Sequence, residues 1–492
     1  MVKKKENYLI CTRLIDTFPK KNNAILNFVS EAALSSFSNY FENKNYNINS
    51  SQWVDKKILL NDFNYIDNIY NELLPQIKEC LNKIHGHKFS LRFWRILVGP
   101  WLGIFIFTLY DRWKNIESAS KNFKIDKLIK LNFNEKNFVP YDNKDFLGFI
   151  QNDVWNQNLY QTMFDEFFNL NQIGVLNLES TKIEKLLKKF DVKPSPKSFL
   201  VKSIFKFFNI FSKKKYKYLL YSTYTGFWNE IKLSFYFNQL PIFIFKIDKY
   251  KTEKKINSEI RGRMFLNFNE KDKFKNFLLK SISMQMPKVF IENFNDLEKF
   301  SSLENLPASP EKIVTANALW FDSFFTYHVA KLAEKNSKII YIQHGGAYGI
   351  SKYSWPEEHE KNISDKYLTW GWKDEKFKSK TKRFYVILKK KKFSWNEKKM
   401  KNLLILMRPR KAYFQTPETS SVGIEPYSNY IKFCGKFLTS VSNKIKSETV
   451  LRFPFKNIRR ESFDLFSKLK NYKVDNKGSF EEACNNSKII IN

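Results

Sequence analysis

The chain has 492 residues, of which 43% are hydrophobic and 17% aromatic, which is enough apolar material for several cores and excludes disorder throughout. Its four cysteines form no Cys-x-x-Cys pair, which excludes a disulfide framework and favours a reducing compartment. The formal net charge of +35 attracts polyanions such as nucleic acid, nucleotides or anionic lipid, although AT-rich coding bias also produces such a lysine-rich composition.

Few strands and helices are predicted in the N-terminal part of the chain. Tyr8–Thr12 reads as a strand and Ile58–Leu60 as a short second strand, while the apolar spacing of Ile66–Ile84 predicts a helix. The longest apolar run, Ile96–Tyr110, is shorter than the roughly 20 residues that span a bilayer. No apolar signal segment follows the basic N-terminus. We therefore expect a cytoplasmic protein whose membrane contact is peripheral.

From about residue 155 onward, strands and helices alternate. The predicted helices are Trp155–Leu170, Phe227–Phe237, Phe321–Asn336, Tyr427–Ile445 and Phe480–Asn486. The predicted strands are Tyr218–Thr223, Pro241–Ile247, Lys312–Ala316, Ile339–His344, Tyr367–Trp370, Asn402–Met407, Thr449–Phe453 and Lys488–Ile491. Such alternation is typical of parallel sheets covered by helices.

The predicted fold class is α/β, with two Rossmann-like domains that face a cleft. We expect an N-terminal α/β domain with helical insertions over residues 1–375, which would bind the acceptor. A basic linker over 376–400 would lead to a C-terminal Rossmann-like domain over 401–492, which would bind a nucleotide. Because the last strand is not followed by the usual loop and helix, this second domain is expected to be truncated.

The strand Ile339–His344 ends in a glycine-rich loop. In open α/β sheets, ligands bind outside the carboxyl ends of the strands. The N–H groups of Gly345 and Gly346 would form a concave anion site there, and His344 would add a group that titrates near neutral pH. A plain strand-to-turn junction with a satisfied histidine is the alternative interpretation.

Basic side chains follow two further strands. Arg408 and Arg410 come after Asn402–Met407, and Arg452 and Lys456 lie around the end of the next strand. Arginine binds phosphate in a bidentate manner, so all four residues are candidate phosphate ligands, although solvated arginines are also common at strand ends.

Asp16 follows the first strand and is a candidate base for an acceptor hydroxyl, with a turn or cap role as the alternative. The five histidines form no tight ligand cluster, and no Gly-x-x-x-x-Gly-Lys loop is present. We therefore predict neither a metal nor another cofactor.

Several segments resemble a transferase family from bacterial O-antigen and surface-carbohydrate gene clusters, over roughly residues 8–492. The segments are Trp94–Leu102 (Trp-Arg-Ile-Leu-Val-Gly-Pro-Trp-Leu), Tyr110-Asp111-Arg112, Asp153–Asn156, the Gln343–Gly349 loop and Thr369–Trp372. The loop is also similar to the His-Gly loop of polyol-phosphate and Kdo-type transferases with a GT-B fold.

The resemblance implies a GT-B-like glycosyltransferase that uses a nucleotide-activated sugar, with a CMP-linked nonulosonic acid as one candidate donor. It implies a surface polysaccharide or lipid-linked glycan as acceptor, and peripheral contact with the anionic inner membrane. It also implies that His344, Gly345, Gly346 and Arg408 serve the leaving phosphate without a metal. The family usually continues past the final strand into a loop and helix that contact the donor.

Two alternatives remain from the sequence. A CDP-polyol phosphotransferase would use the same His-Gly loop. A non-enzymatic polyanion- or nucleic-acid-binding protein would fit the charge, but the aromatic residues mostly follow core spacing, which makes nucleic acid an unlikely partner.

Overall fold

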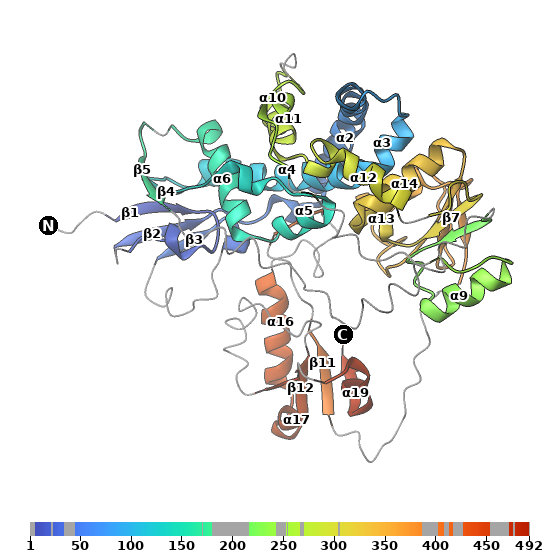
Figure 1. Ribbon diagram of the computed structural model, residues 1–492. Coiled ribbons are helices and arrows are strands. Elements are labelled where there is room, and N and C mark those ends of the chain that lie inside the picture. The colour runs from blue at the N-terminus through green and yellow to red at the C-terminus, as the bar shows by residue number, and fades with distance from the viewer. Residues whose placement is uncertain are drawn as a thin grey trace.

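The computed structural model describes three parallel sheets and a central group of helices (Figure 1). The described residues are 5–20, 23–33, 45–169, 171–179, 216–242, 252, 254–265, 270–303, 306–385, 402–407, 413–416, 427–452, 472–475 and 478–491. Most of the predicted linker, residues 386–400, lies outside these ranges. Every strand pairing is parallel, which confirms the α/β fold class.

The first sheet has the strand order β3-β2-β1-β4-β5. Its strands are β1 (Glu6–Ile10), β2 (Ala24–Phe28), β3 (Tyr46–Ile48), β4 (Lys127–Asn132) and β5 (Gly174–Glu179). Because β2 and β4 flank β1, the chain changes direction across the sheet between β1 and β4. The carboxyl ends of these two strands therefore form a topological switch point, where ligands bind in such sheets.

The second sheet has the order β10-β9-β8-β7-β6, so each new strand is added on the same side. Its strands are β6 (Tyr218–Leu220), β7 (Lys312–Thr315), β8 (Lys338–Ile342), β9 (Lys366–Thr369) and β10 (Thr381–Arg383). Right-handed crossovers that advance in one direction place their helices on one face of a sheet.

The third sheet has the order β13-β12-β11-β14 and lies apart from the other two in Figure 1. Its strands are β11 (Asn402–Leu406), β12 (Thr449–Arg452), β13 (Lys473–Val474) and β14 (Ser487–Ile491). Since β12 and β14 flank β11, this sheet has its own switch point, between β11 and β14.

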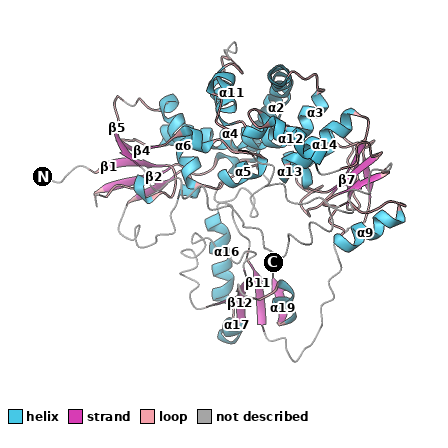
Figure 2. Cartoon of the chain, viewed as in Figure 1, coloured by secondary structure: helices cyan, strands magenta, loops and turns pink. Residues whose placement is uncertain are grey.

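Helices connect the strands of all three sheets, and the central ones, such as α4, α5 and α11, lie between the first two sheets in Figure 2. They are α2 (Lys56–His85), α3 (Leu91–Leu97), α4 (Gly99–Asn122), α5 (Asn143–Phe149), α6 (Asp153–Phe167), α9 (Phe227–Tyr236), α10 (Ser258–Gly262), α11 (Lys273–Gln285), α12 (Phe294–Leu303), α13 (Ala318–Phe321), α14 (Ser323–Glu334), α15 (Trp355–Ile363), α16 (Tyr427–Ser440), α17 (Asn443–Glu448) and α19 (Phe480–Asn485).

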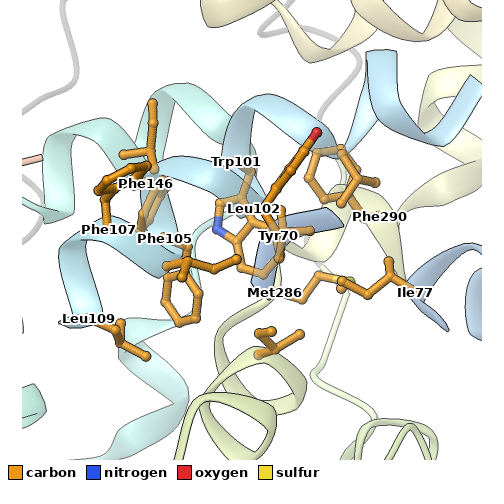
Figure 3. Packing of buried hydrophobic residues seen from close by; sticks show 14 of the residues in the cluster. Tyr70, Ile77, Trp101, Leu102, Phe105, Phe107, Leu109, Phe146, Met286 and Phe290 are labelled. Carbon is orange, nitrogen blue, oxygen red and sulfur yellow. The ribbon is translucent and has the colours of Figure 1, made fainter. Parts of the chain in front are cut away.

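One hydrophobic core serves both the first and the second sheet. It contains Leu9 of β1 and Ile339 of β8, together with the buried faces of the central helices. Figure 3 shows part of it, where Trp101 stacks on Phe105 of α4 with their ring centroids 4.9 Å apart. The third sheet has separate, smaller cores, such as the cluster around Leu403. The region predicted as one N-terminal domain thus contains two sheets with a common core.

The prediction of a strand at Ile58–Leu60 is wrong, because these residues lie in α2. The side chain of Asp55 accepts hydrogen bonds from the N–H groups of Lys57 (2.7 Å) and Ile58 (3.3 Å), which begins the helix just before the apolar run. The helix ends at Gly86, whose φ of 66° is a left-handed cap conformation.

Within the described ranges, no single helix is long and apolar enough to cross a bilayer. The pair α3 and α4, bent by 63°, would meet that test together, by length and composition. Most of the residues of α4 from Gly99 to Ile116 are buried in the shared core.

Candidate functional site

Loops from neighbouring strands meet at the carboxyl edge of the second sheet. Ser222, in the loop after β6, donates to Oδ1 of Asn317 after β7 at 2.8 Å. Asn317 Nδ2 in turn donates to the hydroxyl of Tyr224 at 2.8 Å. The ring of Tyr224 lies 5.8 Å from the ring of His344, which follows β8. This edge therefore places His344 among polar side chains from three strand ends.

His344 is held in a mostly buried position with two polar neighbours. Its Nδ1 lies 3.9 Å from Oε1 of Glu360, and the hydroxyl of Tyr348 lies 3.3 Å from its Nε2. Burial lowers the pKa of His344 to about 4, although the backbone of Ala316 acts in the opposite direction. The imidazole is therefore neutral at pH 7, and a neutral imidazole can accept a proton.

Glu360, in α15, is completely buried behind His344. Its Oε1 accepts hydrogen bonds from Trp320 Nε1 (2.7 Å) and the Tyr348 hydroxyl (3.0 Å). Its Oε2 accepts from Tyr367 at 3.1 Å. Burial raises the pKa of Glu360 to about 8, and these hydrogen bonds offset only part of that effect. The carboxyl group is consequently protonated for the most part at pH 7.

The two groups influence each other through their charges. Opposite unit charges about 4 Å apart attract by about 4 kcal/mol at the effective dielectric constant of a protein. A proton that arrives on His344 therefore favours ionisation of Glu360, and a charged Glu360 favours an imidazolium. Tyr348 touches both groups, so it is placed to hold their relative orientation.

Gln343 fixes the loops after β8 and β9 to each other. Its backbone N–H donates to Leu368 O at 2.9 Å. Its Oε1 accepts from Trp370 N and from Trp372 Nε1, both at 2.8 Å, and its Nε2 donates to Gly345 O at 2.8 Å. The Gln343 side chain thus connects the loop after β8 to the loop after β9.

The glycines of this loop have different roles. Gly349 has a φ of 79°, and a Cβ there would lie 2.5 Å from Trp372 Cε2, so a side chain is excluded. Gly345 is half-buried and Gly346 is exposed. Neither of their N–H groups donates a hydrogen bond within the described part of the chain. Both are therefore available to an anion, as the sequence suggested.

Two glycines of α4 allow α15 to pack closely behind the site. A Cβ on Gly103 would lie 1.9 Å from Cη2 of Trp355, and one on Gly99 would lie 2.7 Å from Cε1 of His359. Gly99 belongs to the Trp94–Leu102 segment on which the family resemblance rests. That segment therefore packs directly against the helix that carries Glu360.

A second polar cluster lies at the carboxyl end of β1, in the first sheet. Arg13 makes a bidentate pair with Asp153, through Nε at 3.0 Å and Nη2 at 2.9 Å. The Tyr413 hydroxyl donates to the same carboxylate at 2.6 Å, and Gln151 Nε2 donates to Tyr413 O at 2.7 Å. Tyr413 comes six residues after Met407, so the loop that follows β11 is attached at the switch point of the first sheet.

Arg112 is completely buried, and its guanidinium carbon lies 5.2 Å from the centre of the Tyr413 ring. Its Nη1 donates to Asp111 Oδ2 at 2.9 Å and to Phe414 O at 2.5 Å, and its Nε donates to Asn156 Oδ1 at 3.0 Å. Arg112 and Asn156 both belong to segments that carry the family resemblance. Both side chains are buried, and Arg112 contacts the segment 413–416 through Phe414 O.

The segment that contains α5 connects the two carboxyl edges. Near its start, Asn143 Nδ2 donates to Trp320 O, at the edge of the second sheet, at 2.6 Å. Just beyond its end, Gln151 and Asp153 bind Tyr413 at the edge of the first sheet. Since α5 has only seven residues, or about 10 Å of helix, the two edges lie near each other.

The structure does not bring all the predicted site residues together. Asp16 lies in a short 3-10 turn of the first sheet, and within the described ranges no hydrogen bond or ion pair joins it to His344. Arg452 is bound to Asp475 Oδ2 (2.7 Å) and Gly478 O (2.7 Å), within the third sheet. Arg408, Arg410 and Lys456 lie outside the described residues.

Sequence reasoning missed Glu360 and Tyr348. Glu360 lies in the charged stretch Trp355–Ile363, which lacks the apolar spacing of a buried helix. Tyr348 follows the His-Gly-Gly motif by two residues, and its position inside that loop was the one available signal. In the part of the chain that the structure describes, no group of three or more His, Cys, Asp or Glu side chains could hold a metal ion.

The fold and the site define an α/β protein of parallel sheets, with a histidine and open glycine N–H groups at the carboxyl edge of one sheet. Over residues 7–492 the chain matches the family described as LIC12162 family transferase. The protein belongs to that family and is a transferase. Neither the curated proteins nor the solved structures gave a match.

Proposed function

We propose that the protein is a GT-B-like glycosyltransferase, which transfers a sugar from a nucleotide-activated donor to a surface polysaccharide or lipid-linked glycan. A CMP-linked nonulosonic acid is the donor we consider first. The observation that carries the proposal is the neutral His344 beside the unengaged N–H groups of Gly345 and Gly346, at the carboxyl edge of a parallel sheet.

The chemistry of sugar transfer matches these groups. The acceptor hydroxyl must lose a proton as it attacks the anomeric carbon, and the departing nucleotide phosphate gains negative charge. In our proposal His344 takes the proton, and the N–H groups of Gly345 and Gly346 receive the phosphate. Oε1 of Glu360, 3.9 Å from Nδ1, is a polar atom that stabilises the positive charge that His344 gains.

In our proposal Arg408 and Arg410 belong to a donor site that includes the third sheet. Arg408 and Arg410 follow β11 in the sequence, and β11 lies at the switch point of that sheet. Tyr413, a few residues later, is bound at the carboxyl end of β1. We propose that residues 401–492 bind the donor together with the N–H groups of Gly345 and Gly346, that Arg408 and Arg410 contact its phosphates, and that the rest of the first two sheets binds the acceptor. Asp16 is then an alternative base on the acceptor side.

The test is thermal stabilisation by CMP, CDP, UDP and GDP, with His344→Ala and Arg408→Ala beside the unchanged protein. A ligand at a hundredfold excess over its Kd stabilises the folded state by about 2.7 kcal/mol. We expect one nucleotide, CMP first, to raise the melting temperature, and both variants to lose that shift. His87→Ala, a change of a partly exposed histidine far along the chain from the loop, should keep it.

A shift with CDP and CDP-glycerol but not CMP would favour a polyol phosphotransferase instead. The absence of any nucleotide shift in a folded protein would contradict the proposal. So would a shift that His344→Ala and Arg408→Ala both retain.

A further inference from the structure

The outer side of α9 carries large aromatic side chains exposed to solvent. Trp228 is 72% exposed, Phe235 58% and Tyr236 80%. Positions 228, 232, 235 and 236 lie on one side of a helix, because they are separated by four, three and one residues. Lys232, also exposed, lies within this stripe. We call these four residues the α9 face.

Residues on the inner side of α9 pack against the rest of the protein, so the α9 face stays exposed to solvent. Ser234 is buried, and Glu230 accepts hydrogen bonds from Thr223 N (2.9 Å) and Thr223 Oγ1 (2.7 Å). The ring of Phe237 stacks on Tyr218 of β6, with centroids 4.1 Å apart. In Figure 1, α9 lies at the periphery of the molecule, beside the edge of the second sheet.

Trp228 differs from the other tryptophans of the described residues. Trp53, Trp94, Trp101, Trp113, Trp155, Trp320 and Trp355 are buried, and Trp370 and Trp372 are half-buried. Exposure of a tryptophan, a phenylalanine and a tyrosine on two turns of one helix leaves a large apolar area in water. Concentrated exposed apolar area of this kind marks an interaction site.

The charge around α9 indicates the chemistry of the partner. Lys232 lies in the stripe, Lys217 is exposed just before β6, and the Lys312 ammonium lies 5.2 Å from the centre of the Tyr218 ring, on which Phe237 stacks. Interfacial helices combine Trp, Phe and Tyr with Lys in this way, because the rings enter the headgroup region while the ammonium groups meet anionic phosphates. A second copy of this chain would bring the same positive charge to the same face and be repelled.

We infer that the α9 face binds the surface of an anionic phospholipid bilayer. The face also adjoins the candidate site, because Tyr224, whose ring lies 5.8 Å from that of His344, comes two residues before the Gly226 cap of α9. Contact with a bilayer would then bring the carboxyl edge of the second sheet close to an acceptor carried on a lipid. The binding itself does not depend on which donor or acceptor the enzyme uses.

The experiment is flotation of the full chain with vesicles of phosphatidylcholine alone and of phosphatidylcholine with phosphatidylglycerol. We expect binding to the anionic vesicles, and about tenfold or more weaker binding after the combined change Trp228→Ser, Phe235→Ser and Tyr236→Ser. Lys232→Glu should weaken binding and reduce its dependence on salt. The matched control is Tyr385→Ser with Phe433→Ser, which removes two exposed aromatic rings elsewhere (82% and 75% exposed) and should bind normally.

Equal vesicle binding by the triple variant and the control, or no binding by the unchanged protein, would overturn the inference. So would selective binding of a short RNA that the triple variant loses while vesicle binding persists. The nucleotide-induced melting shift should be the same in the triple variant as in the unchanged protein. A failure of the membrane inference is thereby distinguishable from a failure of the proposed transferase chemistry.

Discussion

The Nδ1 atom of His344 lies 3.9 Å from the Oε1 atom of Glu360, a carboxyl group without any exposed surface. Burial disfavours the charged form of each group, so it lowers the pKa of the histidine and raises that of the glutamate. The pair is therefore neutral at pH 7, and it becomes an ion pair when a proton moves to the imidazole and another leaves the carboxyl.

The first prediction concerns stability and pH. The pKa of Glu360 is about 8 in the folded protein and about 4.5 when unfolded, so between pH 5 and 8 the folded state holds a proton that the unfolded state has lost. The proton on Glu360 stabilises the folded state fully below about pH 4.5. This stabilisation is lost as the pH rises through 8, and the free energy of unfolding falls by at most about 1.4 kcal/mol per pH unit. Glu360→Gln should remove this slope in urea unfolding at pH 5.5 and 8. Equal slopes in both proteins would contradict the assignment.

Titration of His344 changes the free energy of unfolding in the opposite direction, and at lower pH. Its pKa falls from 6.5 to about 4 on folding, so the unfolded state binds a proton that the folded state does not. Stability contributed by the neutral imidazole is present above pH 6.5 and is lost as the pH falls to 4. His344→Gln should flatten the unfolding free energy over that range and leave the range from pH 7 to 8 unchanged.

The second prediction concerns the hydroxyl of Tyr348. Tyr348→Phe removes the contacts to His344 and Glu360 but keeps the ring, so the free energy of unfolding should change by only about 1 kcal/mol. Turnover with the donor identified by melting should fall by about tenfold to a hundredfold, because the proton-accepting group loses its orientation. Tyr353→Phe, in the same loop, is the control and should keep its turnover. Equal rates for the two variants would exclude this role of Tyr348.

The third prediction concerns the contact between α4 and α15. Gly103→Ala would place a methyl group 1.9 Å from Trp355, and overpacking of this kind costs about 1–3 kcal/mol or more. Gly435→Ala, in α16, meets nothing within 4 Å and should gain about 0.5–1 kcal/mol from helix propensity. Chemical unfolding of the two variants should therefore give shifts of opposite sign. A stabilising Gly103→Ala would show that the helices are not packed this closely.

The fourth prediction concerns the attachment of Tyr413. A double-mutant cycle of Tyr413→Phe with Asp153→Asn should give a coupling energy of about 1–3 kcal/mol, since the phenol donates to a carboxylate at 2.6 Å. The control cycle pairs Tyr413→Phe with Asp475→Asn of the third sheet, and those effects should add within about 0.5 kcal/mol. A coupling energy near zero in the first cycle would mean that residues 413–416 are not held at β1 in solution.

The second and third sheets were largely predictable, because their strands are short apolar runs that end in turn residues. The predicted strand Ile339–His344 matches β8, although it begins one residue late and ends two residues late. The first sheet was largely missed beyond Tyr8–Thr12, because strands such as β4 (Lys127–Asn132) interrupt their apolar residues with lysine and asparagine. The apolar spacing of α2 was detected only from Ile66, although its Asp55 cap was readable in the sequence.

The sequence indicated the candidate site only through its glycine-rich motif, where a titratable side chain stands beside two glycines. His344 and the open N–H groups of Gly345 and Gly346 follow from the motif alone. Glu360 does not, because its helix is rich in charge, and its burial results from Trp355 packing into the space left by Gly103. That space is created by a segment more than 250 residues earlier in the chain, which no local pattern reveals.

The shared core of the first and second sheets limits how the molecule can move. Leu9 and Ile339, from strands of different sheets, belong to one continuous apolar cluster, so a hinge between these sheets would expose that cluster to water. The third sheet has its own core, and its described attachment to β1 is the short segment 413–416, in which Tyr413 donates to Asp153 and the ring of Phe414 lies 6.1 Å from that of Trp53. We therefore expect any opening and closing around a substrate to move the third sheet relative to the first two sheets, which move as one rigid unit.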